Sequence, residues 1–236
     1  MISSLASETP HFYFLTLFPD VIHAYLNSSM MKRAIDKGFF KVTVLNIRDF
    51  TNSPHKKVDD TPYGGGAGMV LMCQPVLDAF RSIEGDLRQG RTKVLMTSPA
   101  GAVFQHETAK HFAETVLDFV FFCGHYEGFD ARLLELIPQM QEISIGDFVL
   151  TGGELPALAM LDAMARFIPN VVKEASSVEN DSFYNGLLDF PHYTKPAVYE
   201  GIAVPDVLLS GHHGAIDAWR SAESLKKTQL VRPDLL

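Results

Sequence analysis

The sequence predicts an α/β fold with a mainly parallel sheet, followed by a small and mostly helical C-terminal domain. In the first part of the chain, short runs rich in Val, Ile and Phe alternate with longer segments of helical periodicity. Alternating strands and helices are typical of parallel sheets. After about residue 171 the chain becomes polar and then rich in Pro, His and Leu, which indicates a linker and a second domain.

The expected strands are short apolar runs that end at polar or glycine-bearing turns. The run DFVFFCG, residues 118–124, is strongly β-prone and predicts a buried strand. The expected strands are 12–18, 41–47, 93–99, 118–124 and 141–150, the last including the loop that follows it.

The expected helices follow from apolar residues at helical spacing and from start and stop residues. The first begins at Pro19 and ends before Gly38, with every fourth residue on one apolar stripe. That stripe consists of Ile22, Leu26, Met30 and Ala34. The other expected helices are 105–117, 130–137, 154–168 and 214–226.

Composition and charge exclude several classes of protein. A chain of 236 residues with 47% hydrophobic residues can form a real core. The net charge of −8 argues against nonspecific nucleic-acid binding, because phosphates repel an acidic surface, although a local basic face is compatible with it. No membrane span is expected, and the polar start MISSLASETP predicts a cytoplasmic protein. Cys73 and Cys123 are expected to be buried free thiols.

Several familiar motifs fail on inspection. The glycine-rich segment 64–68 is not a GxGxxG loop, because Met69 occupies the last glycine position, and no Lys-Ser/Thr follows as in a P-loop. His106 and His111 are spaced as HExxxH rather than HExxH, so they point to different sides of a helix and cannot share a metal ion. No metal site is therefore expected.

Three glycine-bearing loops follow expected strands at 97–101, 124–128 and 144–153. Ligands of α/β proteins bind at the carboxyl ends of strands, where glycines let the backbone come close to them. One such loop is an ordinary turn, but three in one sheet predict a shared ligand site. Thr151 and Glu154 also fit a capping box that begins the following helix.

The sequence resembles the tRNA (guanine-N1)-methyltransferase family of the SPOUT class through motifs that cover nearly the whole chain. In chain order these are YGGGAGM, GHYEGFD, SIGDFVLTGGELPA, RFIPNV, EASSVENDSF, GLLDFPHYTKP and VPDVLLSG. The resemblance implies a deep trefoil knot, a homodimer with active sites at the subunit interface, and a tRNA substrate. It also implies a catalytic domain at 1–171, a linker or lid at 172–183 and a helical tRNA-binding domain at 184–236.

The resemblance further implies that S-adenosylmethionine (SAM) donates a methyl group to N1 of guanosine 37, next to the anticodon. Asp181 would be the general base, and Arg166 would stabilise negative charge on the guanine. Residues from the three glycine-bearing loops would bind SAM. They are Ser98, Pro99, Gly101, Gly124, Tyr126, Glu127, Ser144, Ile145, Gly146, Leu150, Gly152, Gly153 and Pro156.

The sequence departs from the family pattern at His125, where Arg is frequent, and at Phe148, where Tyr is common. It also stops at Leu236, whereas family members commonly continue for another helix, which indicates either a shorter second domain or a trimmed sequence and leaves the RNA contacts of this domain open. Two alternatives stay open: a SPOUT enzyme that modifies another RNA site, and a noncatalytic protein that binds RNA or SAM.

Overall fold

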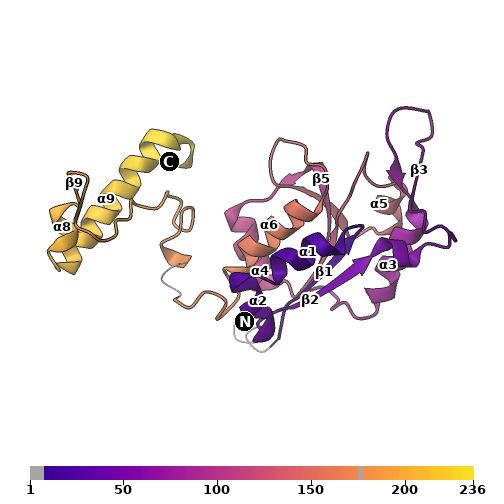
Figure 1. Ribbon diagram of the computed structural model, residues 1–236, viewed down its shortest axis with the longest axis horizontal. Coiled ribbons are helices and arrows are strands. Elements are labelled where there is room, and N and C mark those ends of the chain that lie inside the picture. Colours follow the sequence, from indigo (N-terminus) through magenta and orange to yellow (C-terminus); the bar gives the residue numbers. More distant parts are fainter. Residues whose placement is uncertain (1–7, 175–177) are drawn as a thin grey trace. The chain divides into compact units, whose positions relative to one another are not determined.

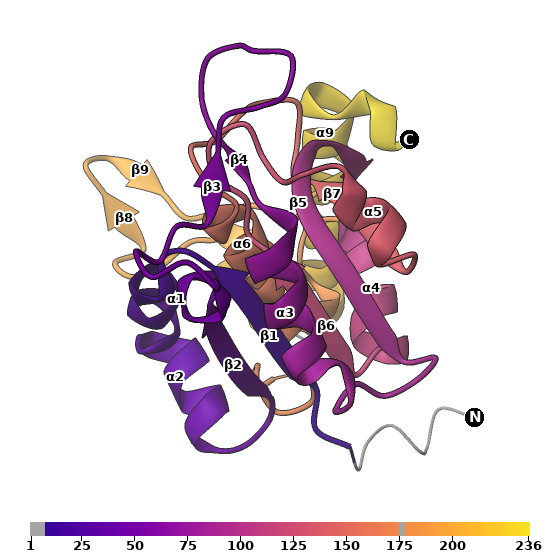
Figure 2. The same ribbon diagram turned by 90° about the vertical axis from the view of Figure 1, so that its right-hand side faces the viewer.

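The computed structural model describes residues 8–174 and 178–236, and it contains a five-stranded parallel sheet in the order β2-β1-β6-β5-β7 (Figures 1 and 2). All of its neighbouring strands run parallel, as the alternation of strands and helices predicted. The strands are β1 (His11–Thr16), β2 (Lys41–Asn46), β5 (Thr92–Val103), β6 (Asp118–Phe122) and β7 (Met140–Ser144).

Helices cover both faces of this sheet (Figures 1 and 2). One layer contains α1 (Pro19–Leu26), α2 (Ser29–Asp36), α4 (His106–Thr115) and α6 (Glu154–Ala165). The other layer contains α3 (Cys73–Glu84) and α5 (Arg132–Leu136). Along β1, Phe12 and Phe14 pack into the first layer, while Tyr13 and Leu15 pack into the second. Burial on both faces explains why the strands are continuous apolar runs.

The first expected helix is two helices, because the chain breaks at residues 27–28 between α1 and α2. Ser29 has φ 46°, a left-handed conformation that interrupts the helical ladder. The break also changes the register of the apolar stripe: Met31 is buried, and Met30 is only partly buried. The regular spacing of apolar residues from Ile22 to Ala34 therefore arose by coincidence, because these residues belong to two separate helices.

Three helices differ further from the prediction. The sequence analysis missed α3, which buries six side chains under the sheet (Pro75, Val76, Leu77, Ala79, Phe80 and Ile83). The helix α6 ends at Ala165 rather than at 168, and α9 (His213–Val231) is longer than expected. Short pairs and single turns complete the first 173 residues: η2 (Ile47–Phe50), β3 (Asp59–Asp60) and β4 (Val70–Leu71).

The chain divides into two compact units, residues 1–173 and 174–236. The second unit contains the hairpin β8 (Val198–Tyr199) and β9 (Ile202–Ala203), then α8 (Asp206–Leu209), α9 and η3 (Pro233–Leu235). Inside it, the buried Thr228 of α9 accepts a hydrogen bond from the Leu188 N–H at 2.9 Å, which holds the preceding segment against the helix. Of the expected linker 172–183, residues 175–177 lie outside the described residues.

No helix in residues 8–174 or 178–236 is long and apolar enough to cross a membrane.

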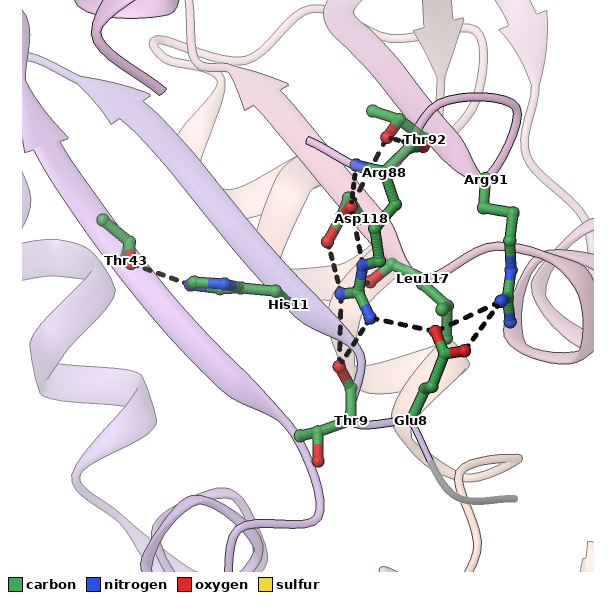
Figure 3. A network of polar contacts seen from close by, with 9 residues as sticks. All are labelled: Glu8, Thr9, His11, Thr43, Arg88, Arg91, Thr92, Leu117 and Asp118. Carbon is green, nitrogen blue, oxygen red and sulfur yellow. Dashed lines mark hydrogen bonds and ion pairs between the residues drawn. The ribbon is translucent and has the colours of Figure 1, made fainter. Parts of the chain in front are cut away.

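A network around Arg88 and Asp118 holds together the amino ends of the strands (Figure 3). Asp118 begins β6 and is 1% exposed, and its carboxylate accepts hydrogen bonds from the Arg88 side chain at 2.5 and 2.9 Å and from the Arg88 N–H at 2.7 Å. Arg88 also donates to the carbonyl oxygen of Thr9 at 3.2 Å. The hydrogen bond to Asp118 raises the pKa of Arg88, so the guanidinium stays protonated.

We expect Asp118→Asn to lower the free energy of unfolding by about 2–4 kcal/mol, because it leaves a guanidinium without its buried counter-charge. Urea unfolding followed by circular dichroism measures this change. The exposed pair Lys32–Asp36, with an N–O distance of 3.0 Å, is the control, and Asp36→Asn should change stability by less than about 0.5 kcal/mol. Equal effects of the two substitutions would contradict a stabilising role of the network.

Candidate active site

A pocket of about 420 Å³ lies at the carboxyl ends of β6 and β7 and beside the middle of β5. Its walls come from the three glycine-bearing segments predicted from the sequence, together with the beginning of α5; the first of them, 97–101, lies inside β5 rather than after it. The volume falls within the usual range of small-molecule sites. The prediction that these loops share one site therefore agrees with their positions around the pocket.

The structure brings all but one of the expected SAM-binding residues to this pocket. Those that line it are Ser98, Pro99, Gly124, Tyr126, Glu127, Ser144, Ile145, Gly146, Leu150, Gly152, Gly153 and Pro156. Gly101 is not among the lining residues. A Cβ at Gly101 would lie 2.2 Å from the backbone nitrogen of Ile143, so this glycine permits β5 and β7 to pack closely.

Gly153 joins the loops at the base of the pocket. Its N–H donates to the Gly124 carbonyl oxygen at 2.8 Å. A Cβ at Gly153 would lie 2.1 Å from Thr97 Oγ1 and 2.8 Å from Cys123 Cα, so only glycine fits. The segment that leads to α6 therefore packs at backbone distance against the ends of β5 and β6.

Sequence reasoning missed part of the pocket wall, which the residues after the second loop supply. Phe129, Asp130, Ala131 and Leu134 line the pocket, as do Thr97, Glu142 and Val149. Phe129, Asp130 and Ala131 directly follow GHYEG and Leu134 lies in the next helix, so extending that motif into α5 could have found them. The pKa of Asp130 is held below its usual range by hydrogen bonds from the Arg132 side chain, so this carboxylate stays charged.

The end of the glycine-rich segment, from Gly68 to Leu71, packs against the second loop. The Glu127 N–H donates to the Met69 carbonyl oxygen at 3.0 Å, and the Leu71 N–H donates to the Gly128 carbonyl oxygen at 2.9 Å. Gly68 has φ 87°, and a Cβ there would lie 2.3 Å from Glu127 Oε1. A segment that matches no nucleotide-binding loop thus supports a loop of the pocket.

The expected capping box of Thr151 and Glu154 is wrong. Gly153 is the N-cap of α6, and no side chain caps that end of the helix. Glu154 is 4% exposed and turns inward, where it accepts a hydrogen bond from Thr16 at 2.5 Å and lies 2.7 Å from the His125 ring nitrogen. The buried Glu154 carboxylate has two hydrogen-bond donors from distant segments. These buried contacts are more favourable than a local cap exposed to solvent.

The two expected catalytic residues lie in different units. Arg166 follows the last residue of α6 as its C-cap, is partly exposed and is not among the residues that line the first pocket. Asp181 lies in the second unit, where it lines another hollow of about 420 Å³. That hollow also contains Asn180, Asn185 and Arg220.

The two cysteines have different surroundings. Cys123 is buried as expected, next to the base of the pocket, whereas Cys73 at the start of α3 is only partly buried. Burial raises the pKa of Cys123 well above its usual value and, together with a hydrogen bond to Asp130, raises the pKa of Cys73 to about 11. Both groups are therefore neutral thiols at neutral pH, which makes them poor nucleophiles.

Known proteins of high similarity cover almost the whole chain. A relative from Clostridioides difficile (strain 630), named tRNA (guanine-N(1)-)-methyltransferase, is 48% identical over 224 residues, which is 95% of this chain and 96% of the relative. Relatives of the same name from Clostridium botulinum (strain 657 / Type Ba4) and Desulfitobacterium hafniense (strain Y51) are each 50% identical. They cover 94% and 95% of this chain and 90% and 83% of their own lengths.

The parallel sheet and the glycine-lined pocket at its carboxyl edge are typical of α/β proteins that bind a small molecule at this edge. The family model for "tRNA (Guanine-1)-methyltransferase TrmD" matches residues 11–236. The chain belongs to the tRNA (guanine-N1)-methyltransferase family, which confirms the resemblance seen in the motifs.

Proposed function

We propose that this enzyme transfers a methyl group from SAM to N1 of guanosine 37 in tRNA, next to the anticodon, in the cytoplasm. The observation that carries the proposal is the pocket: family membership specifies methyl transfer, and the family's cofactor motifs meet around one small-molecule cavity. Residues 1–171 would form the catalytic domain, 172–183 a linker or lid, and 184–236 the domain that binds tRNA.

The residues of the pocket fit SAM chemically. Ile145, Leu150 and Pro156 offer apolar surface for the adenine ring, and the glycines bring backbone N–H and C=O groups near its edge. Glu127 adds a carboxylate that can attract the positive sulfonium or amino group. When bound, SAM supplies a methyl group on a positively charged sulfur.

Asp181 and Arg166 would act at different atoms of the guanine. N1 carries a proton and is a poor nucleophile until that proton leaves, and the Asp181 carboxylate would accept it. Negative charge then develops on O6, where the Arg166 guanidinium would stabilise it, since Arg is well suited to guanine O6 and N7. The N1 lone pair would form the new bond to the methyl carbon as the bond from carbon to sulfur breaks.

The second unit has the side chains that an anticodon arm requires. Arg220 stacks on the ring of Phe190, with its guanidinium 5.0 Å from the ring centroid, and the rings of Tyr193 and Trp219 lie 6.3 Å apart. Planar cations and aromatic rings bind unpaired bases by stacking. Exposed basic side chains at Lys195, Lys226 and Lys227 would contact phosphates.

We infer a homodimer from the exposed face of α1 and α6. The helix α6 is apolar except for Glu154 and Asp162, and Leu155 is 59% exposed. Such a helix is normally covered. Phe18, Val21 and Tyr25 form a second exposed apolar row beside it. A second copy of the chain would cover this face and place its lid, with Asp181, over the pocket of the first subunit.

The close packing of the glycine-bearing loops supports the proposed trefoil knot. Gly153 lies at backbone distance from the end of β6 and next to Thr97 in β5, while Gly101 lies at backbone distance from β7. Such close packing of the three segments is compatible with the knot that the family resemblance implies, although knots are rare in proteins. The knot would make the three walls of the pocket inseparable without unfolding.

The test is transfer of labelled methyl from SAM to an unmodified tRNA transcript with guanosine at position 37, with an adenosine-37 transcript as the matched control. Label in the guanosine transcript alone is the expected result. Label in both transcripts would indicate that the enzyme methylates another RNA site. SAM binding without any methyl transfer would indicate a noncatalytic protein.

A further inference from the structure

A chain of polar contacts adjoins the pocket, and one of its members, His125, is part of the pocket wall. The Thr16 hydroxyl donates to Glu154 Oε1 at 2.5 Å, and His125 Nε2 lies 2.7 Å from Glu154 Oε2, where its N–H can donate. Glu154 is 4% exposed and Thr16 is fully buried. Both carboxylate oxygens have a partner, so losing either one leaves a buried acceptor unsatisfied.

This chain joins three segments that are far apart in the sequence. Thr16 ends β1, His125 follows β6, and Glu154 begins α6. Phe18 connects the two ends of this chain of contacts. Its backbone N–H donates to Thr16 Oγ1 at 2.8 Å, and the centroid of its side-chain ring lies 4.6 Å from that of the His125 ring. The Glu154 carboxylate and the Phe18 ring therefore hold the imidazole from two sides.

The space around His125 permits little movement. A Cβ at Gly152 would lie 2.3 Å from His125 Cε1 and 2.7 Å from Glu154 Oε2. His125 and Gly152 also form a backbone bridge, and the next residue, Tyr126, has φ 59°. A non-glycine residue in this conformation needs support from its surroundings. The position of the His125 side chain therefore determines the path of the loop that carries Tyr126 and Glu127.

We propose that Thr16, Glu154 and His125 form a positioning unit that holds the 124–128 loop in the shape that binds SAM. The proposal rests on the proposed function in naming SAM as the ligand, whereas its effect on the loop is independent of any ligand. His125 also lines the pocket, whereas Thr16 and Glu154 do not line it and act only through the loop.

The experiment compares four variants by hydrogen exchange of the ligand-free protein and by calorimetric titration with SAM. His125→Ala removes the donor, whereas His125→Gln keeps a donor and serves as the conservative rescue. Thr16→Val removes the other donor at nearly constant shape. Asp118→Asn is the matched control, because it weakens the opposite edge of the same sheet without touching the pocket.

In His125→Ala and Thr16→Val, we expect amides 124–128 to exchange about 10- to 100-fold faster and SAM to bind weaker by a similar factor. At saturating SAM, kcat should fall less than about threefold, so that the loss appears in the KM for SAM. His125→Gln should recover most of both losses, and Asp118→Asn should leave loop exchange and SAM affinity unchanged.

Unchanged exchange of the loop in His125→Ala would overturn the inference, as would an equal loss of SAM affinity in Asp118→Asn. A wild-type protein that binds no SAM, but whose loop still loosens in His125→Ala, would contradict the proposed function and leave the positioning unit in place. The two failures are therefore distinguishable.

Discussion

Asp181→Asn should lower the rate of methyl transfer by about 10²- to 10⁴-fold, the usual contribution of a general base. The amide keeps the size of the side chain but cannot accept the N1 proton. Asp181 lies in the second unit and is not among the residues that line the glycine-loop pocket, so the affinity for SAM should stay within about twofold of the wild-type value. Single-turnover transfer of labelled methyl and calorimetric titration with SAM measure the two quantities.

The matched control for this prediction is Glu179→Gln. It removes the same charge two residues earlier, from an exposed side chain that lines the same hollow. Its transfer rate should stay within about threefold of the wild-type rate, because exposed charges contribute little at a distance. If SAM affinity falls together with turnover in Asp181→Asn, or if Glu179→Gln is equally slow, Asp181 is not the base.

Val21→Asp should make the protein monomeric and lower methyl transfer by at least about 100-fold. Val21 is 41% exposed on the row formed by α1, and a carboxylate there could not be buried against a second subunit without a large desolvation cost. If the base reaches the pocket only from the partner subunit, separation removes the full contribution of general-base catalysis. Sedimentation equilibrium and the transfer assay, run at the same protein concentration, test both parts.

Leu136→Asp provides the control for the dimer, since Leu136 is 50% exposed at the end of α5, in the other helical layer. This variant should stay dimeric and active. When Val21→Asp chains are mixed with wild-type chains, the total methyl-transfer activity should equal that of the wild-type chains alone. A monomeric Val21→Asp protein with full activity would exclude an active site shared between subunits.

The predictable part of the fold depended on local patterns. Runs such as 118–124 are apolar and β-prone because both faces of their strand are buried, so they can be read without knowing their neighbours. The helix α3 was not predicted, although it buries Val76 and Phe80 at helical spacing directly after the glycine-rich loop. The break before Ser29 was hidden because apolar residues in α1 and α2 kept a spacing of four by coincidence.

The candidate site was predictable to a similar extent and for a similar reason. Glycine-bearing loops after strands are local features, and parallel topology brings such loops to one edge of the sheet. The role of each glycine could not be read from its neighbours in the sequence. Gly101 and Gly153 both occur in expected glycine-bearing loops, yet Gly101 packs against β7 and Gly153 lines the pocket. Likewise, Glu154 matched a capping box, but its partners are Thr16 and His125.

By itself, the sequence determined the parallel α/β class, the membership in a tRNA methyltransferase family and the loops that surround the pocket. Periodicity and contiguous motifs carry that information, because they depend on residues near one another in the chain. Only the tertiary structure decided that α1 and α2 are separate, that α3 covers the second face, and that Glu154 joins Thr16 to His125. Those outcomes depend on burial and on contacts across more than one hundred residues of sequence, such as the separation of 138 residues between Thr16 and Glu154, which no local pattern encodes.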